Sequence, residues 1–376
     1  MKNIGIYVPS ISRNNGGSST ILDIASRLKN LGCDVSLYSI LGKLDNLLYR
    51  PSYFNPAYYN LRTFPHKFIL NRNFNALKKI LNHFAPQPKK ILHDLIIDAT
   101  LLKKEKRAEL SKKSKIILNH AGSPSAFKDY FLKVESIEEY LEYCSGYDGV
   151  IFQSKNQMNE YLNLQKDSMK TQKIFCCVPP ANDQEIKKIL HRRRLNNSKI
   201  RIICVGSLQE RKNQIEIIYY ANMLRNKTKD FEFILAGNIV DKSYYKKICL
   251  EISKNNLQKH IKIVGFRKDY LSLIYNADFL VHPSLQEGVS RVLREAMALG
   301  KLSISYALDG TKDLSPKGTE IMLCNDRDSI SNSILEVIKD NKLLKNYENN
   351  AFKKYWSEFS EENYISKLED YINEFK

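Results

Sequence analysis

The chain has 376 residues, more than one ordinary domain holds, so its length predicts two domains. A composition of 43% hydrophobic and 27% charged residues is typical of a globular protein with a sizeable core, and no apolar run approaches the roughly 20 residues of a membrane span. The formal net charge of +18 favours an anionic partner.

Targeting and redox signals are weak in this sequence. The N-terminal stretch MKNIGIYVPS is too short in apolar residues for a signal peptide. The 7 cysteines are scattered without a CxxC pair, which is typical of reduced core cysteines and predicts neither a disulfide framework nor a zinc site. We therefore expect a cytoplasmic protein, either free or peripheral on the inner face of the cell membrane.

The first half of the chain alternates expected strands with helices. NIGIYVP is the first expected strand, and the polar turn NNGGSS leads into a helix with Ile21, Ile24, Ala25 and Leu28 on one face. DVSLYSI, KKILHDLII, KIILNHAG, GVIFQS and KIFCCVPPAND are the next expected strands. Short apolar runs of this kind are typical of a parallel sheet buried on both faces.

A second alternation begins after the segment PPANDQEIKKILHRRRLNNSK. RIICVGSL, FEFILAG, HIKIVGF, ADFLVHPS and KLSISYA are expected strands with helices between them. We therefore expect an α/β protein of two doubly wound domains that face each other across a cleft, over residues 1–184 and 185–357. The tail, residues 358–376, is expected to be a helix that crosses back to the first domain.

A stretch without acidic residues lies between Asp45 and Asp94. It interleaves eight Lys or Arg side chains with nine Tyr or Phe side chains. This pattern suits an anionic membrane surface, a polyanion or nucleic acid, while the alternative is a plain lysine-rich surface. We favour the membrane or an anionic acceptor and expect no nucleic-acid partner.

Two carboxylates stand at a fixed interval in PSLQEGVSRVLREAMALGK, residues 283–301. Glu287 precedes a helix that is expected to start near Ser290, and Glu295 lies more than one turn inside it. The first-turn amides of that helix form an anion site, and Gly288 allows a ligand to approach the backbone. A diphosphate on these amides would leave one carboxylate for a hydroxyl-bearing group on either side. Acids near a helix N-terminus are also common for reasons of dipole alone.

Positive charge follows the strand that ends at Gly206. Arg211 and Lys212 are expected to face the same cleft, where they would neutralise a departing diphosphate, although a solvated helix start explains them as well. Gly16 and Gly17 follow the first strand, but the pattern is not GxGxxG and no acid ends the second strand. A nicotinamide-dependent oxidoreductase is therefore disfavoured.

His120 ends an expected strand of the first domain in KIILNHAG. A histidine facing the cleft can bond a sugar hydroxyl or exchange a proton, whereas a lone histidine is more often structural. His282 in VHPS is interpreted as structural, and His93 stays open between the two roles. No metal-binding spacing occurs near these groups, so no metal or other cofactor is expected.

Together these segments resemble the retaining glycosyltransferases of the GT-B fold, specifically glycosyltransferase family 4. The most specific part is Glu287 to Glu295 followed by AMALG, which looks like the E-x7-E signature of that family. The resemblance implies that Glu295 holds the nucleotide ribose, Glu287 the hydroxyls of the donor sugar and Lys212 the diphosphate. It also implies that His120 lies near the donor sugar and that Gly17 lines the donor phosphate.

The resemblance extends to backbone positions and has two departures. It assigns donor contacts to Gly16, Gly206, Phe266, Arg267, Gly288, Val289, Ser290, Arg291 and Val292. Ser207 stands where the family usually has an arginine, so Arg211 is expected to supply that charge. Val289 and Ser290 replace a common Phe-Gly pair.

The expected activity is metal-independent, retaining transfer of a sugar from a nucleotide diphosphate-sugar, with UDP as the expected nucleotide. The expected acceptor is a cell-surface glycan or a polyprenyl-diphosphate-linked oligosaccharide, and the nucleotide-sugar is a substrate rather than a cofactor. The alternatives are a nucleotide-sugar epimerase of the same fold and a non-catalytic polyanion-binding protein.

Overall fold

A computed structural model describes residues 2–8, 16–39, 93–120, 124, 127–165, 172–195, 199–228 and 230–375. The chain divides into two compact units, each with its own parallel sheet. Unit 1 comprises Met1–Cys177 together with Ile365–Lys376, and unit 2 comprises Val178–Tyr364. Unit 2 starts ahead of residue 185 because α7 (Asp183–Leu190) packs against helices of the second sheet.

Unit 1 holds, within its described residues, a six-stranded sheet of order β2-β1-β3-β4-β5-β6, and every neighbouring pair is parallel. Its strands are β1 (Asn3–Val8), β2 (Asp34–Ser39), β3 (Leu95–Asp98), β4 (Lys115–Asn119), β5 (Gly149–Phe152) and β6 (Lys173–Cys176). Its helices are α1 (Gly16–Asn30), α3 (Lys104–Ser111), the π-helix η4 (Phe127–Leu132), α5 (Ile137–Ser145) and α6 (Lys155–Leu164).

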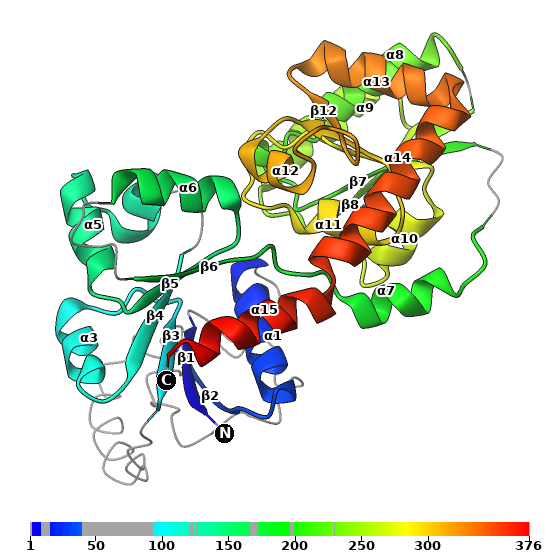
Figure 1. Ribbon diagram of the computed structural model, residues 1–376. Helices are drawn as coiled ribbons and strands as arrows, with labels where there is room; N and C mark the ends of the chain where they lie inside the picture. Colours follow the sequence, from blue (N-terminus) through cyan, green and yellow to red (C-terminus); the bar gives the residue numbers. More distant parts are fainter. Residues whose placement is uncertain are drawn as a thin grey trace, which may run out of the picture. The chain divides into compact units, whose positions relative to one another are not determined.

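The apolar pattern of the first half is realised in this sheet (Figure 1). The helix expected after the glycines is α1, and Ile21, Ile24 and Leu28 are buried as the 3.6-residue period predicts. The strand expected in KKILHDLII is displaced toward its end, since β3 begins only at Leu95. His93 precedes that strand, is buried, and bonds Asn3 Oδ1 at 2.8 Å and the Tyr38 hydroxyl, which is a structural role.

Unit 2 holds, within the residues described, a six-stranded parallel sheet of order β12-β11-β10-β7-β8-β9. Its strands are β7 (Ile200–Val205), β8 (Phe231–Ala236), β9 (Ile261–Gly265), β10 (Phe279–His282), β11 (Ser303–Tyr306) and β12 (Met322–Cys324). The helical elements besides α7 are η6 (Glu210–Lys212), α8 (Glu216–Arg225), α9 (Lys242–Lys254), α10 (Tyr270–Asn276), α11 (Arg291–Ala298), α12 (Asp309–Leu314), α13 (Arg327–Lys339), α14 (Asn341–Lys354) and η7 (Tyr355–Phe359).

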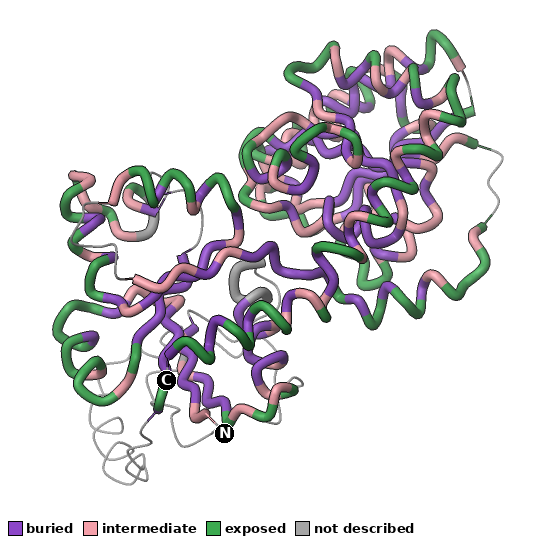
Figure 2. The backbone as a smooth tube through the Cα atoms, viewed as in Figure 1, coloured by how far each residue is buried: buried purple, intermediate pink, exposed green. Residues whose placement is uncertain are grey.

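Successive side chains of the central strands serve two opposite core layers of unit 2. On β7, Ile202 packs in the layer under α8, α9 and α13, while Ile203 packs in the layer under α7, α10 and α11. Figure 2 shows these strands as buried tube inside partly exposed helices. The two-sided burial explains why the strands are continuous apolar runs without polar alternation.

Helix α15 (Glu361–Asn373) starts in unit 2 and its later residues pack in unit 1. Its buried stripe includes Tyr364, Leu368 and Tyr371, and the Tyr371 hydroxyl donates to the Lys173 carbonyl at 3.1 Å. At Gly149 a Cβ would lie 2.4 Å from the Tyr371 hydroxyl, so β5 needs glycine there to accept the helix. The expected fold class, an α/β chain with two doubly wound parallel sheets, is confirmed.

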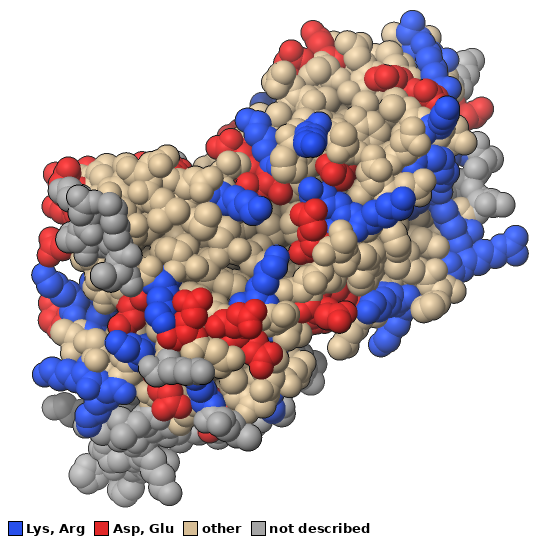
Figure 3. Space-filling view, in the orientation of Figure 1, with Lys and Arg blue, Asp and Glu red and all other residues tan. Residues whose placement is uncertain are grey.

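No helix in the described part of the chain is long and apolar enough to cross a bilayer. The basic and aromatic stretch, residues 46–92, lies outside the described residues. On the face shown in Figure 3, the described Lys and Arg side chains are interspersed with Asp and Glu over both units.

Candidate functional site

The loops after β7 and β10 meet at the reversal point of the second sheet. These strands are neighbours in the sheet although β8 and β9 come between them in the chain. Ligands of open α/β sheets bind beyond the carboxyl ends of the strands at such a point. The two loops are joined by the Arg211 carbonyl, which accepts from Leu285 N at 2.9 Å and from Ser284 Oγ at 3.1 Å.

Glu287 is the carboxylate at the centre of this junction. Its Oε1 accepts hydrogen bonds from Lys212 Nζ and from His282 Nε2, the latter at 3.1 Å, and its side chain is only 10% exposed. Burial by itself would raise the pKa of Glu287, but the hydrogen bond and charge of His282, together with Lys212, lower that pKa to about 2. Glu287 is therefore an ionised hydrogen-bond acceptor at neutral pH.

His282, interpreted from the sequence as a structural residue, also belongs to this cluster. It is the last residue of β10, is buried, and lies 3.3 Å from Ser290 Oγ as well as beside Glu287. Because a carboxylate only accepts hydrogen bonds, the His282 Nε2 proton points at Glu287. Its place at the carboxyl end of a strand bordering the reversal point was the available signal.

Helix α11 begins where the sequence predicts, with Ser290 as its N-cap and Arg291 as its first residue. The Ser290 side chain caps none of the first-turn amides. These amides lie at the positive end of the helix dipole, beside Gly288, which is exposed. The first turn of α11 is therefore suited to an anion, with Glu287 and Lys212 next to it.

Gly310, in α12, packs directly against the backbone of the loop that carries Glu287. A Cβ at Gly310 in α12 would lie 1.8 Å from the Gly288 carbonyl oxygen and 2.9 Å from Val289 N. Both atoms are backbone, so no side-chain rotation relieves the overlap. The close approach of α12 therefore restricts the position of the loop that precedes α11.

Glu295 is the second carboxylate and is fully buried within α11. Its Oε1 accepts from the Tyr270 hydroxyl at 2.6 Å and from Arg291 Nε at 2.8 Å. Its Oε2 is buried and has no hydrogen-bond partner among the described residues. A buried, unpaired carboxylate oxygen is costly, so Glu295 is suited to receive a donor hydrogen from outside the protein.

The remaining predicted residues of unit 2 lie around these two acids. Arg211 is exposed, and its Nη1 donates to the Gln286 carbonyl at 3.3 Å. Gly206 directly follows β7 and precedes η6, and Val292 is half-buried in the first turn of α11. Phe266 follows β9 and is 58% exposed. Arg267 beside it is engaged by Asp269 through two hydrogen bonds of 2.8 and 2.7 Å.

Three predicted site residues lie in unit 1. Gly16 and Gly17 are the first two residues of α1 rather than a turn ahead of it. His120 directly follows β4, is fully buried, and its Nε2 lies 2.8 Å from the Tyr140 hydroxyl. Its ring stacks on Phe127 with centroids 4.1 Å apart, so the described surroundings of His120 are aromatic.

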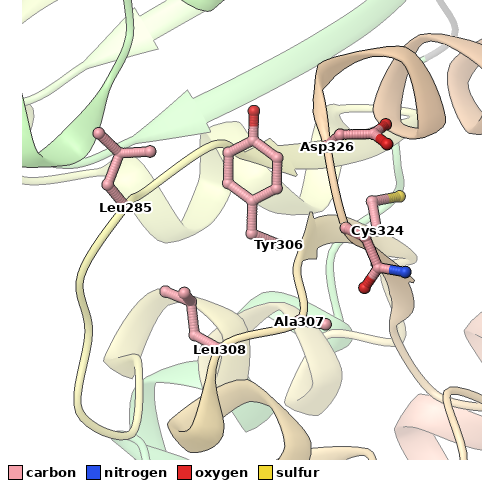
Figure 4. A pocket seen from close by; sticks show the side chains of 7 residues that line it. Leu285, Tyr306, Ala307, Leu308, Cys324 and Asp326 are labelled. Atoms are coloured by element: carbon pink, nitrogen blue, oxygen red, sulfur yellow. The ribbon is translucent and has the colours of Figure 1, made fainter.

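A further pocket of about 370 Å³ opens at the carboxyl ends of β11 and β12. Figure 4 shows Leu285 and Leu308 on one side of the Tyr306 ring and Cys324 and Asp326 on the other. Leu285 belongs to the same loop as Glu287, so this pocket borders the candidate site on the side away from β7. Among the described residues, no cluster of three or more His, Cys, Asp or Glu side chains has the arrangement of a metal site.

Residues 185–354 match the family described as Glycosyl transferases group 1. The matched range contains Lys212, Glu287 and Glu295. The family resemblance expected from the E-x7-E stretch is thereby confirmed.

Two curated relatives are named as glycosyltransferases. The chain is 35% identical over 136 residues to an uncharacterized glycosyltransferase of Methanocaldococcus jannaschii. The matched region covers 35% of this chain and 37% of that protein. It is 28% identical over 200 residues to the UDP-Gal:alpha-D-GlcNAc-diphosphoundecaprenol alpha-1,3-galactosyltransferase of Escherichia coli, over 51% of this chain and 49% of that protein. The chain thus spans about half the length, or less, of these relatives.

Solved structures share the fold over the whole chain. Sucrose-phosphate synthase from Thermosynechococcus elongatus has a TM-score of 0.74 at 16% identity, covering 100% of this chain and 99% of that one. Anabaena HepE in complex with UDP and glucose has a TM-score of 0.69 at 16% identity, covering 99% and 100%. At these identities the likeness shows the fold alone, which is GT-B.

Proposed function

We propose that this protein is a retaining, metal-independent glycosyltransferase that moves a sugar from a UDP-linked donor to a glycan or lipid-linked oligosaccharide. The observation that carries the proposal is the arrangement at the start of α11. One buried acid, Glu295, leaves an oxygen unpaired, a second acid, Glu287, is held ionised, and Lys212 contacts that second acid. Cation, helix amides and two hydroxyl acceptors together match a nucleotide diphosphate-sugar.

Each group has a role in this proposal. The amides of Val289 to Val292 and the Lys212 ammonium bind the diphosphate, and exposed Arg211 adds charge at its edge. Glu287 accepts hydrogen bonds from the hydroxyls of the donor sugar, and Glu295 accepts one from the ribose. When the donor binds, Lys212 moves from Glu287 toward the diphosphate. Lys212 then contacts a phosphate oxygen, and Glu287 contacts a sugar hydroxyl.

The chemical step follows from a site that stabilises the leaving group. The bond between the sugar's anomeric carbon and the diphosphate oxygen breaks, and the acceptor oxygen bonds to that carbon on the same face. The acceptor proton passes to the departing phosphate oxygen. Lys212, Arg211 and the α11 amides stabilise the negative charge that grows on the diphosphate, which is the contribution a metal makes in other enzymes.

The acceptor side of the proposal has separate support. The relative from Escherichia coli is named for an acceptor linked to diphosphoundecaprenol. The net charge of +18 and the basic, aromatic stretch over 46–92 suit an anionic membrane that carries such an acceptor. His120 is proposed to lie near the donor sugar, on the strength of the family resemblance alone.

A transfer assay tests the proposed function. Thermal-shift screening against UDP-, GDP- and ADP-sugars identifies the donor, and turnover is then measured with a lipid-diphosphate-linked sugar as acceptor, with and without EDTA. Glu295→Ala and Lys212→Ala are each expected to lower kcat/KM by about 100-fold or more, roughly 3 kcal/mol of transition-state stabilisation. Glu336 is an exposed acid of α13, so Glu336→Ala is the matched control and is expected to keep full activity.

The same assay separates the rival functions. A donor whose sugar changes configuration without any acceptor identifies an epimerase. A polyanion-binding protein binds its ligand equally well after Glu295→Ala, with steep salt dependence, and turns over no nucleotide-sugar. Either result, or turnover that EDTA abolishes, contradicts the proposal.

A further inference from the structure

Both hydrogen bonds that the structure gives Glu295 fall on the same oxygen. The Tyr270 hydroxyl, at 2.6 Å, and Arg291 Nε, at 2.8 Å, both donate to Oε1. Oε2 of the same carboxylate is buried without a partner among the described residues. The two oxygens of Glu295 are therefore not equivalent, because one is saturated by the protein and the other is not.

We infer that Tyr270 is a positioning residue that fixes Glu295 so that Oε2 alone accepts a hydrogen bond from one ribose hydroxyl of the donor nucleotide. The inference rests on the proposed function, since it presumes that Glu295 meets a ribose. It goes beyond that function in assigning a role to Tyr270 and in predicting contact with a single hydroxyl rather than a bidentate grip on the ribose diol.

Tyr270 is placed to do this by its position at the start of α10. It follows the loop after β9 that carries Phe266 and Arg267, whereas Glu295 and Arg291 lie on α11. The phenol thus ties the carboxylate to a second helix, while Arg291 ties it only to its own helix, four residues away. The Arg291 side chain is 39% exposed.

The Tyr270 hydroxyl stays protonated beside Glu295 and therefore remains a hydrogen-bond donor. Burial, followed by the negative charge of Glu295, raises the pKa of Tyr270 well above its usual range, so the hydroxyl stays protonated. A hydrogen bond from a neutral hydroxyl to a buried carboxylate is among the stronger side-chain bonds. Without it, Glu295 keeps only the bond to Arg291 and loses its link to α10.

Affinity measurements with modified ribose test the inference. Dissociation constants are measured by calorimetry for UDP, 2′-deoxy-UDP and 3′-deoxy-UDP, with the GDP or ADP series used instead if the donor screen selects that base. The wild-type protein is expected to lose about tenfold in affinity or more for one of the two deoxy compounds and little for the other. In Tyr270→Phe that discrimination is expected to shrink to about threefold or less.

Tyr275→Phe is the matched control on the same helix. Its hydroxyl donates to the Arg192 carbonyl at 3.1 Å and does not contact Glu295, so the variant should keep the wild-type discrimination. A merely structural role for Tyr270 would lower affinity for all three nucleotides equally. Equal weakening, or loss of affinity for both deoxy compounds alike in the wild-type protein, overturns the inference.

A crystal structure of Tyr270→Phe without nucleotide supplies a readout that does not depend on binding. The Glu295 carboxylate is expected to leave the position it holds in the wild-type crystal or to occupy more than one rotamer. If it stays in place, Tyr270 is not a positioning residue, whatever the nucleotide data show. If no nucleoside diphosphate binds the wild-type protein, the proposed function and the ribose contact both fail, and the crystal structure alone decides the role of Tyr270.

Discussion

Glu287 is the residue at which the charges of the candidate site meet. Two donors, Lys212 and His282, converge on one of its oxygens in a position that is nearly closed to solvent. Such a carboxylate is stable only while it is ionised, since protonation would remove the charge that both donors face. Its ionisation therefore contributes to the stability of unit 2 as well as to the proposed recognition of a sugar.

The low pKa of Glu287 predicts a pH-dependent stability. Because its pKa falls from 4.5 to about 2 on folding, its contribution is fully present above pH 4.5 and is lost as the pH falls toward 2. By pH 3 the loss is expected to be about 2 kcal/mol. Urea unfolding from pH 6 to pH 3, followed by fluorescence of Trp356, the single tryptophan, measures it in unit 2.

Glu287→Gln is the reference for this measurement because glutamine keeps the shape and does not titrate. The difference in unfolding free energy between wild type and variant should narrow steadily as the pH falls below 4.5. A difference that is constant across the range would show that Glu287 does not have a depressed pKa.

At the scale of elements, the site is built by short segments at the ends of strands. The 3-10 helix η6 is joined to the β10 loop by the backbone bond from Leu285 N to the Arg211 carbonyl, and α12 meets the loop before α11 at Gly310. Strands β7 and β10 place the loops of the site at the edge of the sheet, but the position of the Glu287 loop also depends on its contact with α12. Gly310 is the point of contact, with no room for a side chain.

Gly310→Ala is therefore expected to displace the Glu287 loop. The added Cβ must push against the Gly288 backbone, at a cost of about 1–3 kcal/mol in the free energy of unfolding. Donor affinity should fall in parallel, because Glu287 and the α11 amides move together. Denaturant unfolding and calorimetry with the donor nucleotide measure the two effects, and Lys312→Ala, on the exposed side of the same helix, is the control. Unchanged stability and affinity in Gly310→Ala would contradict the close approach.

At the scale of the whole molecule, net charge is the property that bears on the partner. The net charge of +18 is large for 376 residues, yet acidic side chains accompany the basic ones on the described face shown in Figure 3. The aromatic stretch over 46–92 carries eight Lys or Arg residues and no acidic residue. We expect that stretch, rather than the overall excess, to determine membrane binding.

Vesicle binding tests this expectation. Charge reversal at Arg72, Lys78 and Lys79 should weaken binding to vesicles rich in anionic phospholipid by about 100-fold at low salt, since each basic residue near such a surface contributes about 1 kcal/mol. The matched control reverses Lys242, Lys246 and Lys247, which are exposed on α9 and give the same change in net charge. Equal weakening by both triple variants would show a general charge effect and contradict a specific membrane face.

The sequence alone determined the E-x7-E pair and, among the described strands, each one except β12, because these are local patterns. An apolar run such as RIICV predicts a buried strand from its own residues. A helix start with flanking acids is likewise recognised within a dozen residues. β12 was not predicted, since three residues carry too short a pattern to read. The start of β3 was misplaced because the apolar run begins before the sheet does.

The tertiary structure alone decided which side chains complete the site. His282 and Tyr270 lie 5 and 25 residues from the acids they contact, and neither carries a motif of its own. Gly310 matters only because α12 folds back on the loop before α11. The physical reason is the same in each case: a hydrogen bond or a backbone contact is decided by position in space, and the order of strands in the sheet, which no local pattern encodes, brings these positions together.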